Sequence, residues 1–253
     1  GVTRAIKTFL LRNWGLILTV VVVEQLIVRV SQYSNVLQTD VFSATAVGML
    51  ATVVGIFIVF RFNEAYQRWW EARILWGALV NDSRTYAREV LTFLTPRRAP
   101  ALESEEAAYR LHRELIYRHI AYCNALRLSL RDQGSWEELA PFLDPAELED
   151  LKKYANKPTR LNRRQGERAA EVLGTDVAQQ VLLTQLDSTL SRLFDTQGGC
   201  ERIKRTAFPD EVRFISRAMV WLSAVAIPVA FLSADNEIRV LEIVAVIVIA
   251  LSF

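Results

Sequence analysis

An uncharged apolar run, Val41–Phe60, constrains the fold of this chain more than any other feature of its sequence. At about 1.5 Å of rise per residue, a helix of roughly 20 residues crosses a hydrocarbon core of about 30 Å. The alternative is a buried helix of a soluble protein, but such a helix rarely stays uncharged over this length. The run therefore predicts a membrane-spanning helix.

Three further segments have the character of membrane spans. An uncharged stretch, 218–234, contains Pro228, whose kink a packed membrane helix tolerates. The N-terminal stretch is interrupted by Glu24 and Arg29, and no small-residue cleavage site follows it, so a retained helix is favoured over a signal peptide. The last apolar segment stops at Phe253 without a polar tail, which predicts a truncated span. The predicted spans cover about residues 14–30, 41–62, 214–234 and 238–253.

The positions of Lys and Arg predict the topology. Basic residues precede the first span, the connection 31–40 has none, and most of the 30 basic residues lie between 61 and 213. Because cytoplasmic loops are enriched in Lys and Arg, both termini and the middle of the chain are expected in the cytoplasm. The sequence therefore predicts two membrane hairpins, residues 1–62 and 213–253, on either side of a cytosolic region, residues 63–212.

Composition narrows the function classes. The formal net charge is only +2, so nucleic acid is not an expected partner. The two cysteines exclude a disulfide-rich secreted scaffold and fit a reducing compartment. Hydrophobic residues make up 51% of the chain and charged residues 23%, which suits apolar spans attached to a charged, water-facing body.

The cytosolic region is predicted to be helical, because no alternating β-type pattern occurs in it. A helix continues from the second span to Leu94, a loop follows at Thr95–Pro100, and Glu103–Arg131 has an amphipathic pattern. Asp144 followed by Pro145 predicts the start of another helix.

Two segments further along the chain complete the predicted cytosolic region. Asn156–Gln165 is basic and irregular, and we expect a solvated loop there, with an anion-attracting vestibule or partner contact as the alternative. Thr175 is expected to cap a helix that runs through Asp195 and is ended by Gly198 and Gly199.

The sequence presents no catalytic or metal-binding constellation. His112 and His119 are seven residues apart, which separates them by about 10 Å along a helix axis and prevents joint ligation of one metal. Cys123 and Cys200 form no CxxC pair and lie in no recognised nucleophile motif. We therefore expect neither an enzyme nor a cofactor or metal site.

Two separated segments resemble the bestrophins, in particular their bacterial branch. The first signature segment, Arg61–Arg84, reads RFNEAYQRWWEARILWGALVNDSR, and the second signature segment, Thr196–Ile203, reads TQGGCERI. The helix around His119 is also similar, and the likeness extends over nearly the whole chain in the same order. The motif residues in the first segment are Arg68, Trp69, Trp70, Glu71 and Arg73.

The resemblance implies an all-α membrane protein with four transmembrane helices, assembled as a homopentamer around one central pore. In the family, a narrow neck lies on the second membrane helix, and counting back from the Arg-Trp-Trp motif places it at Thr52, Ile56 and Phe60. Packing between helices is the plainer alternative for these three residues. Thr52 departs from the bulkier apolar residue that is common there. A second, cytosolic aperture is expected at Val181, with Leu182 as its nearest alternative.

The function implied by the resemblance is passive flow of small monovalent ions across a bacterial plasma membrane. Chloride is the default for the family, monovalent cations are associated with the bacterial branch, and the sequence leaves the choice open. The expected partners are further copies of the chain, membrane lipid and the permeant ions. The animal members carry an acidic calcium-binding segment after the last span. The sequence stops at Phe253, before any such segment, and shows no EF-hand pattern, so calcium activation is not carried over from the resemblance. The rival hypotheses are a membrane-anchored scaffold or sensor that binds a protein partner and, third, a membrane enzyme.

Overall fold

The computed structural model describes residues 44–132 and 134–206, with isolated helical positions at 22, 25, 26, 29, 212, 214, 215, 218 and 219. Its contacts divide the chain into two units, Gly1–Gln67 with Phe208–Phe253 and, separately, Arg68–Ala207. The predicted spans at 14–30, 214–234 and 238–253 lie almost wholly outside the described residues. Within the described part of the chain, no helix combines the length and the apolar character needed to cross a membrane.

Helix α2, Ala44–Phe93, is one uninterrupted helix of 50 residues. The prediction that the helix of the second span continues far beyond Phe60 is therefore confirmed. It ends just before Pro96, where the chain turns and the backbone N–H of Ala99 donates to the carbonyl of Thr95 at 2.8 Å. Proline restricts the residue before it to extended conformations, which explains the end of the helix and confirms the predicted loop.

Helix α3, Glu105–Arg131, confirms the predicted amphipathic helix. The Ser104 hydroxyl accepts a hydrogen bond from the backbone N–H of Ala107, which satisfies one of the unpaired donors of the first turn. The helix stops at Asp132, which adopts a left-handed conformation with φ of 49°.

A short connection leads from α3 to the predicted helix start at Pro145. It contains the 3-10 helix η2, Trp136–Leu139, and ends in α4, Pro145–Lys152. The Asp144 side chain accepts from the backbone N–H of Ala146 at 2.9 Å, and Pro145 occupies the first turn. Both features were expected from the Asp-Pro pair.

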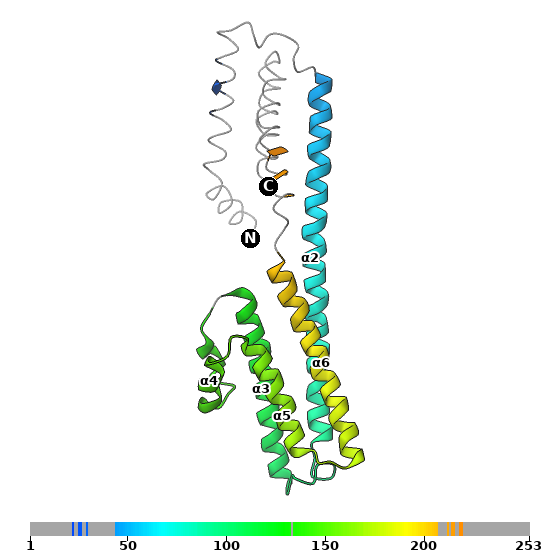
Figure 1. Cartoon of the computed structure of the whole chain (residues 1–253), viewed down its shortest axis with the longest axis vertical. Coiled ribbons are helices and arrows are strands. Elements are labelled where there is room, and N and C mark those ends of the chain that lie inside the picture. Colours follow the sequence, from blue (N-terminus) through cyan, green and yellow to red (C-terminus); the bar gives the residue numbers. More distant parts are fainter. Residues whose placement is uncertain are drawn as a thin grey trace. The chain divides into compact units, whose positions relative to one another are not determined.

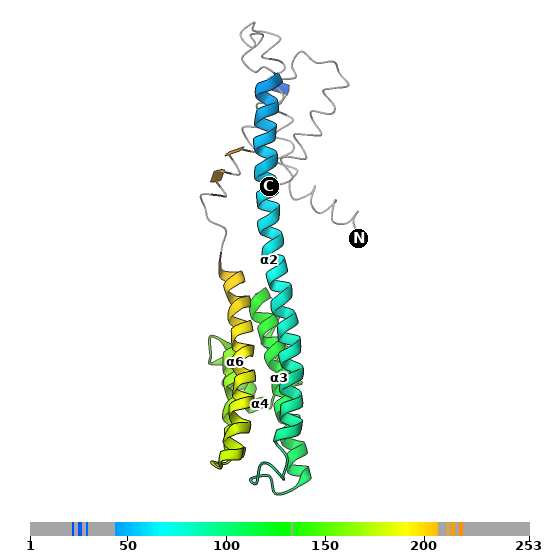
Figure 2. The same cartoon turned by 90° about the vertical axis from the view of Figure 1, so that its right-hand side faces the viewer.

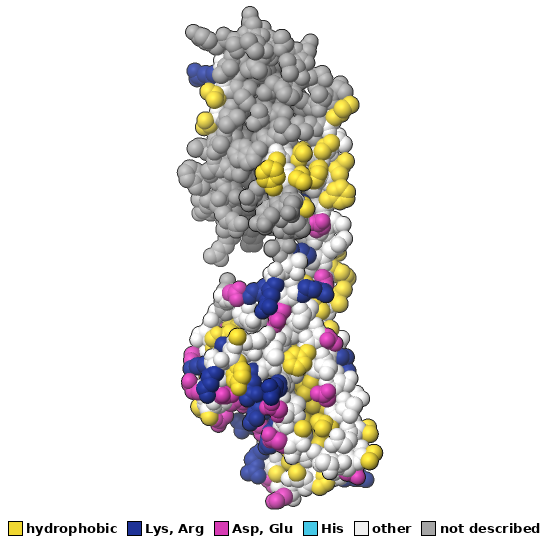
Figure 3. All heavy atoms as spheres, in the orientation of Figure 1, with side chains coloured by type: hydrophobic (Ala, Val, Ile, Leu, Met, Phe, Trp, Pro, Cys, Tyr) yellow, Lys and Arg dark blue, Asp and Glu magenta, His cyan; other side chains and the backbone are white. Residues whose placement is uncertain are grey.

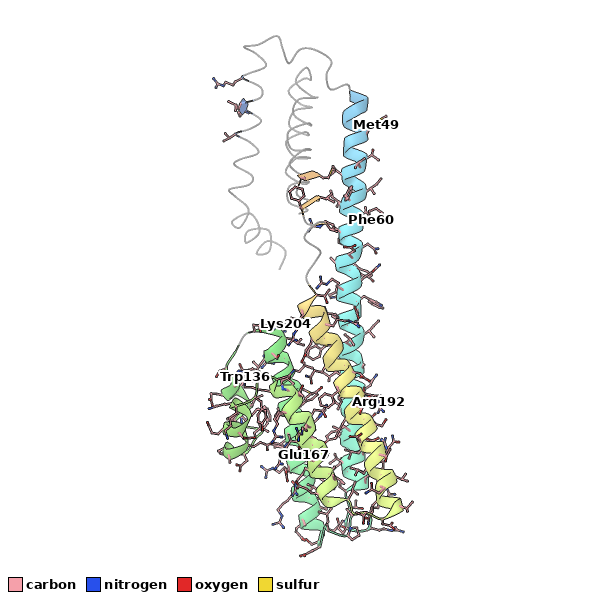
Figure 4. All side chains as sticks on the ribbon, viewed as in Figure 1. Met49, Phe60, Trp136, Glu167, Arg192 and Lys204 are labelled. Atoms are coloured by element: carbon pink, nitrogen blue, oxygen red, sulfur yellow. The ribbon has the colours of Figure 1, made fainter. Side chains whose placement is uncertain are left out.

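The expectation of a loop at Asn156–Gln165 is wrong, because helix α5 covers Lys157–Val172. The Asn156 side chain accepts from the backbone N–H of Thr159 at 3.1 Å and so caps the helix. Its arginines are neutralised by acidic neighbours: Glu167, labelled in Figure 4, bonds Arg163 at 2.7 Å and Arg164 at 3.4 Å. This pairing weakens the alternative of an anion-attracting surface.

Helix α6, Val177–Arg205, also differs from expectation at both ends. Its cap is Asp176, which accepts from the backbone N–H of Ala178, and not Thr175. The prediction that Gly198 and Gly199 end the helix is wrong, since α6 continues through both glycines. Tertiary packing against α2 favours the helical conformation here over the weak intrinsic propensity of glycine.

The second unit is a helical bundle in which α3, α6 and the C-terminal part of α2 lie side by side (Figures 1 and 2), and α5 packs against α3 and α6. Its core is one cluster of buried apolar side chains, among them Leu115, Leu126, Leu161 and Leu186. Every described element is a helix. The predicted all-α fold class is thus confirmed for this part of the chain.

Candidate functional site

The three expected neck positions lie on the N-terminal part of α2. Thr52, Ile56 and Phe60 are spaced four residues apart, so their side chains follow one another along one side of the helix. All three are exposed in the single chain, Ile56 to 50% and Phe60 to 62%. Their exposure suits either a pore lining or a contact with another helix.

The polar group of Thr52 is satisfied inside its own helix. The Thr52 hydroxyl donates to the carbonyl of Gly48 at 2.8 Å, one turn earlier. The outward part of the side chain is then mainly its methyl group. Despite the departure from a bulkier apolar residue, all three expected neck positions present apolar groups.

The same stretch of α2 carries further exposed apolar side chains. Met49, Val53 and Val59 are exposed alongside Ile56 and Phe60. Figure 3 shows hydrophobic side chains gathered there, and Figure 4 labels Met49 and Phe60 on the helix. Contiguous exposed apolar surface of this kind marks a site of contact with protein or membrane.

The two candidates for the cytosolic aperture differ in exposure. Val181 lies on the first turns of α6 with 63% of its surface exposed, whereas Leu182 is partly buried and packs against the core. Val181 therefore has the larger exposed surface of the two candidates.

The structure brings the two signature segments together between α2 and α6. The Arg68 guanidinium donates two hydrogen bonds of 2.8 Å, one to the carbonyl of Ile203 and one to that of Thr206. The last carbonyls of a helix lack partners within the helix and carry partial negative charge, so a cation stabilises them. Arg68 thus caps the C-terminal end of α6.

Two further contacts join the segments. Glu71 of α2 forms an ion pair with Arg202 of α6. At Gly199, an added Cβ atom would lie 2.8 Å from the Cδ2 atom of Leu75 and 3.0 Å from its Cδ1 atom. The absence of a side chain at Gly199 therefore allows Leu75 to pack directly against the α6 backbone.

The second signature segment also binds α5. The Gln197 amide donates to the Thr159 hydroxyl and to Glu201, both at 2.8 Å, and the Asn156 amide donates to Glu201 at 3.0 Å. Gln197 is buried, so these bonds are shielded from water. The segment consequently holds the N-terminal end of α5 as well as α2.

The tryptophans of the first signature segment point outward. The rings of Trp69 and Trp70 lie 6.1 Å apart, and the Arg73 guanidinium lies 6.0 Å from the Trp69 ring. Trp69 is 55% exposed, and Ile74 and Trp70 are similarly exposed. Exposed aromatic and apolar side chains that lie close together are typical of a protein contact surface.

Replacing Gly199 by alanine is expected to destabilise the second unit relative to the same change at Gly198. Both glycines lie inside α6, so both gain about 0.5–1 kcal/mol of helix propensity. At Gly199 this gain is offset by the clash with Leu75, at a cost of about 1–3 kcal/mol, while no atom of the described residues lies within 4 Å of a Cβ added at Gly198. Thermal unfolding in detergent measures the difference; equal midpoints for the two variants would contradict the close packing.

The environments of His112, His119 and Cys123 indicate structural roles for these side chains. His112 Nε2 lies 2.8 Å from the carbonyl of Leu94. His119 is buried, which lowers its pKa to about 4 and keeps it neutral. Burial raises the pKa of the Cys123 thiol, which disfavours its reactive thiolate form. Among the residues that the structure describes, no group of three or more His, Cys, Asp or Glu side chains is arranged to hold a metal.

Sequence comparisons identify relatives of this chain. The voltage-dependent anion channel-forming protein mll4386 of Mesorhizobium japonicum is 32% identical over 200 residues, which are 79% of this chain and 60% of the relative. The voltage-dependent anion channel-forming protein YneE of Escherichia coli is 30% identical over 189 residues, 75% of this chain and 58% of the relative. The chain thus spans about three fifths of the length of these curated relatives.

Solved structures show the same fold. Crystal structures of two variants of a bacterial bestrophin homologue from Klebsiella pneumoniae match with TM-scores of 0.75 and 0.76, each at 20% identity. The matches cover 93% and 98% of this chain and 85% of the homologue in each case. The family model described as Bacterial/Fungal Bestrophin protein matches residues 5–253. The resemblance of the two signature segments is thereby confirmed, and the chain belongs to the bacterial and fungal bestrophin family.

Proposed function

We propose that this protein is a subunit of a homopentameric ion channel that lets small monovalent ions flow passively across a bacterial plasma membrane. Membership of the bestrophin family carries the proposal, because the relatives with significant similarity are named as channel-forming proteins. The alternative is a membrane-anchored scaffold or sensor, which would need a protein partner and would carry no current.

The membrane span is proposed from the uncharged run Val41–Phe60 of the sequence, and α2 continues from this run far beyond Phe60. Its 50 residues correspond to about 75 Å, more than twice the roughly 30 Å of a hydrocarbon core. The uncharged part of α2 ends at Phe60, and Arg61 follows at the expected cytoplasmic boundary. We place the membrane around the two hairpins, residues 1–62 and 213–253, with both termini in the cytoplasm.

The neck is proposed to gate the channel through its apolar surface. Five copies of Thr52, Ile56 and Phe60 would form three stacked rings of apolar groups around the axis. A narrow pore lined in this way loses its water when it closes, and small repacking of the side chains restores conduction. Val181 is proposed to form the second constriction, since Leu182 is engaged in the core.

Self-association accounts for the exposed surface of α2. In a single chain, about half of the surface of Trp69, Trp70 and Ile74 is exposed. A second copy that covers these side chains would gain about 25 cal/mol for each Å² of apolar area buried. Membrane lipid is the proposed partner of the remaining apolar surface.

Anions are the favoured permeant ions, because the relatives are named as anion channel-forming proteins. The neck residues carry no formal charge and so do not set the sign of the ion. The test is the reversal potential of the purified protein in a planar bilayer under a tenfold gradient of potassium chloride. Near-ideal selectivity displaces the reversal potential by about 59 mV from zero. A reversal potential with the sign expected for chloride supports an anion channel. The opposite sign would show that the protein is a cation channel instead.

A further inference from the structure

Charges of opposite sign are exposed on two helices of the second unit. Over residues 69–93, every exposed charged side chain of α2 is an arginine, namely Arg73, Arg84 and Arg88. Over residues 177–198, the exposed charged side chains of α6 are both acidic, namely Asp187 and Asp195. Within the described residues, neither Arg84 nor Asp187 forms an ion pair. The outer surfaces of α2 and α6 are therefore complementary in charge.

Each of these two surfaces also exposes apolar groups. Gly77, Val80 and Arg84 follow one another at intervals of three and four residues, so they lie on one side of α2. Asp187 and Phe194 are seven residues apart, which places them on one side of α6. Val80 and Phe194 are both exposed. We call the first group the α2 face and the second group the α6 face.

Gly77 indicates that another segment packs closely on the α2 face. Inside a helix, glycine is less favourable than alanine. Gly199 is explained by the packing of Leu75, but no atom of the described residues lies within 4 Å of a Cβ added at Gly77. Glycine suits positions at which a neighbour approaches the helix backbone. The α2 face therefore has room for a large side chain from outside the described part of the chain.

The contact between α2 and α6 inside one chain uses other sides of the two helices. Arg192, labelled in Figure 4, donates from α6 to Asp82 of α2 at 2.9 Å. Asp187 is five residues before Arg192, which places it about 140° away around α6. Arg84 is two residues after Asp82, about 160° away around α2. Both faces thus remain available to another molecule.

The distribution of charge favours a second copy of the chain, bound head to tail. A two-fold symmetric contact would bring each face against itself and so oppose charges of the same sign. A head-to-tail contact instead places the α2 face of one copy on the α6 face of the next, where the charges are opposite. Head-to-tail contacts generate closed rings when the rotation between copies closes.

The spacing of the residues along the two helices also matches. The ion pairs between α2 and α6 show that the two helices run antiparallel. In a ring all copies point the same way, so α2 of one copy also runs antiparallel to α6 of the next. Gly77 and Arg84 are seven residues apart, as are Phe194 and Asp187, which corresponds to about 10 Å on each helix. One placement therefore brings Phe194 opposite Gly77 and Asp187 opposite Arg84.

We propose that neighbouring copies join through these faces, with Phe194 of one copy packed over Gly77 of the next and Asp187 paired with Arg84. The inference rests on the proposed homopentamer and identifies the contact that joins its second units. Val181 is six residues before Asp187 and lies about 120° away around α6. It can therefore face the pore while Asp187 faces the neighbouring copy.

Exchanging the two charges tests the contact. We expect Arg84→Asp and Asp187→Arg each to raise the protein concentration at which half of the chains are assembled by at least about tenfold, because like charges then meet. The double variant restores opposite charges, so its assembly is expected to return towards that of the wild type. Gly77→Leu fills the space over the α2 face and is expected to weaken assembly as well. Native mass spectrometry of the purified full chain in detergent, at decreasing protein concentration, measures each effect.

Arg163→Asp is the matched control, because Arg163 is an exposed arginine of α5 and belongs to neither face. Its assembly should equal that of the wild type. Single variants that assemble like the wild type, or a double variant weaker than both, would overturn the contact while the homopentamer stands; lipid or another protein would then cover these faces. A wild-type chain that remains monomeric would overturn the homopentamer and the contact together.

Discussion

Replacing Ile56 by alanine is expected to raise the single-channel current, and Phe60→Ala to raise it as well. Truncation widens the proposed neck and removes apolar surface, so it lowers the free-energy barrier that a dewetted constriction places before an ion. Each lowering of about 1.4 kcal/mol increases the rate of passage about tenfold. Single-channel recording in planar bilayers measures the effect.

A matched control lies on the same helix. Ile58 is two residues from Ile56, is partly buried, and projects from a different side of α2. We expect Ile58→Ala to leave the single-channel current unchanged. Unchanged currents in both Ile56→Ala and Phe60→Ala would contradict the proposal that these residues line the neck. An equal increase in Ile58→Ala would contradict it as well.

The largest effect on stability is expected from Arg118→Met. The Arg118 side chain is only 6% exposed and bonds Glu147 at 2.5 and 2.8 Å and Glu114 at 3.1 Å. Burial alone lowers its pKa, but the bonds to Glu147 and Glu114 outweigh burial and raise it. The substitution removes the arginine that pairs with Glu147, whereas Glu114 keeps its ion pair with Arg168 at 3.2 Å. Breaking a buried pair costs roughly 3–5 kcal/mol, and the partial exposure of the two carboxylates reduces the expected loss to about 2–3 kcal/mol.

Arg127 provides the control for this change. It also lies on α3 and pairs with Glu138 at 2.6 Å, but both side chains are more than one third exposed. Surface pairs contribute about 0–1 kcal/mol, so Arg127→Met is expected to change stability little. Thermal unfolding of both variants in detergent checks the difference. Similar midpoints for the two would show that the Arg118 pairs do not stabilise the bundle.

Local signals were sufficient to predict several elements of the bundle. The apolar spacing of α3, the Asp-Pro start of α4 and the two prolines after α2 act within a few residues of the chain, so the sequence displays them directly. Helix α5 was missed because its arginines make it look solvated, and the acidic partners that neutralise them become visible only in the folded chain. The Gly198–Gly199 pair was misread for a related reason, since the packing of Leu75 against α6 is a tertiary contact.

Part of the candidate site could likewise be predicted from the sequence, and the rest depends on contacts that form only in the fold. Every side of the run Val41–Phe60 is apolar, so periodicity could not select a pore face, and Thr52, Ile56 and Phe60 rest on the family resemblance. The two signature segments could be recognised, but their joining through Arg68 requires the end of α6 to lie beside α2. Burial of Leu182 separates it from Val181, a distinction that adjacent apolar residues do not show in a sequence.

The current carried by the purified full chain in a planar bilayer tests the central claim most directly. The account predicts discrete, passive single-channel currents in symmetric salt that are absent from protein-free bilayers. They should grow when Ile56 is replaced by alanine. Protein that is folded and pentameric in detergent, yet carries no current over a wide range of voltage, would contradict the channel and favour a membrane-anchored scaffold.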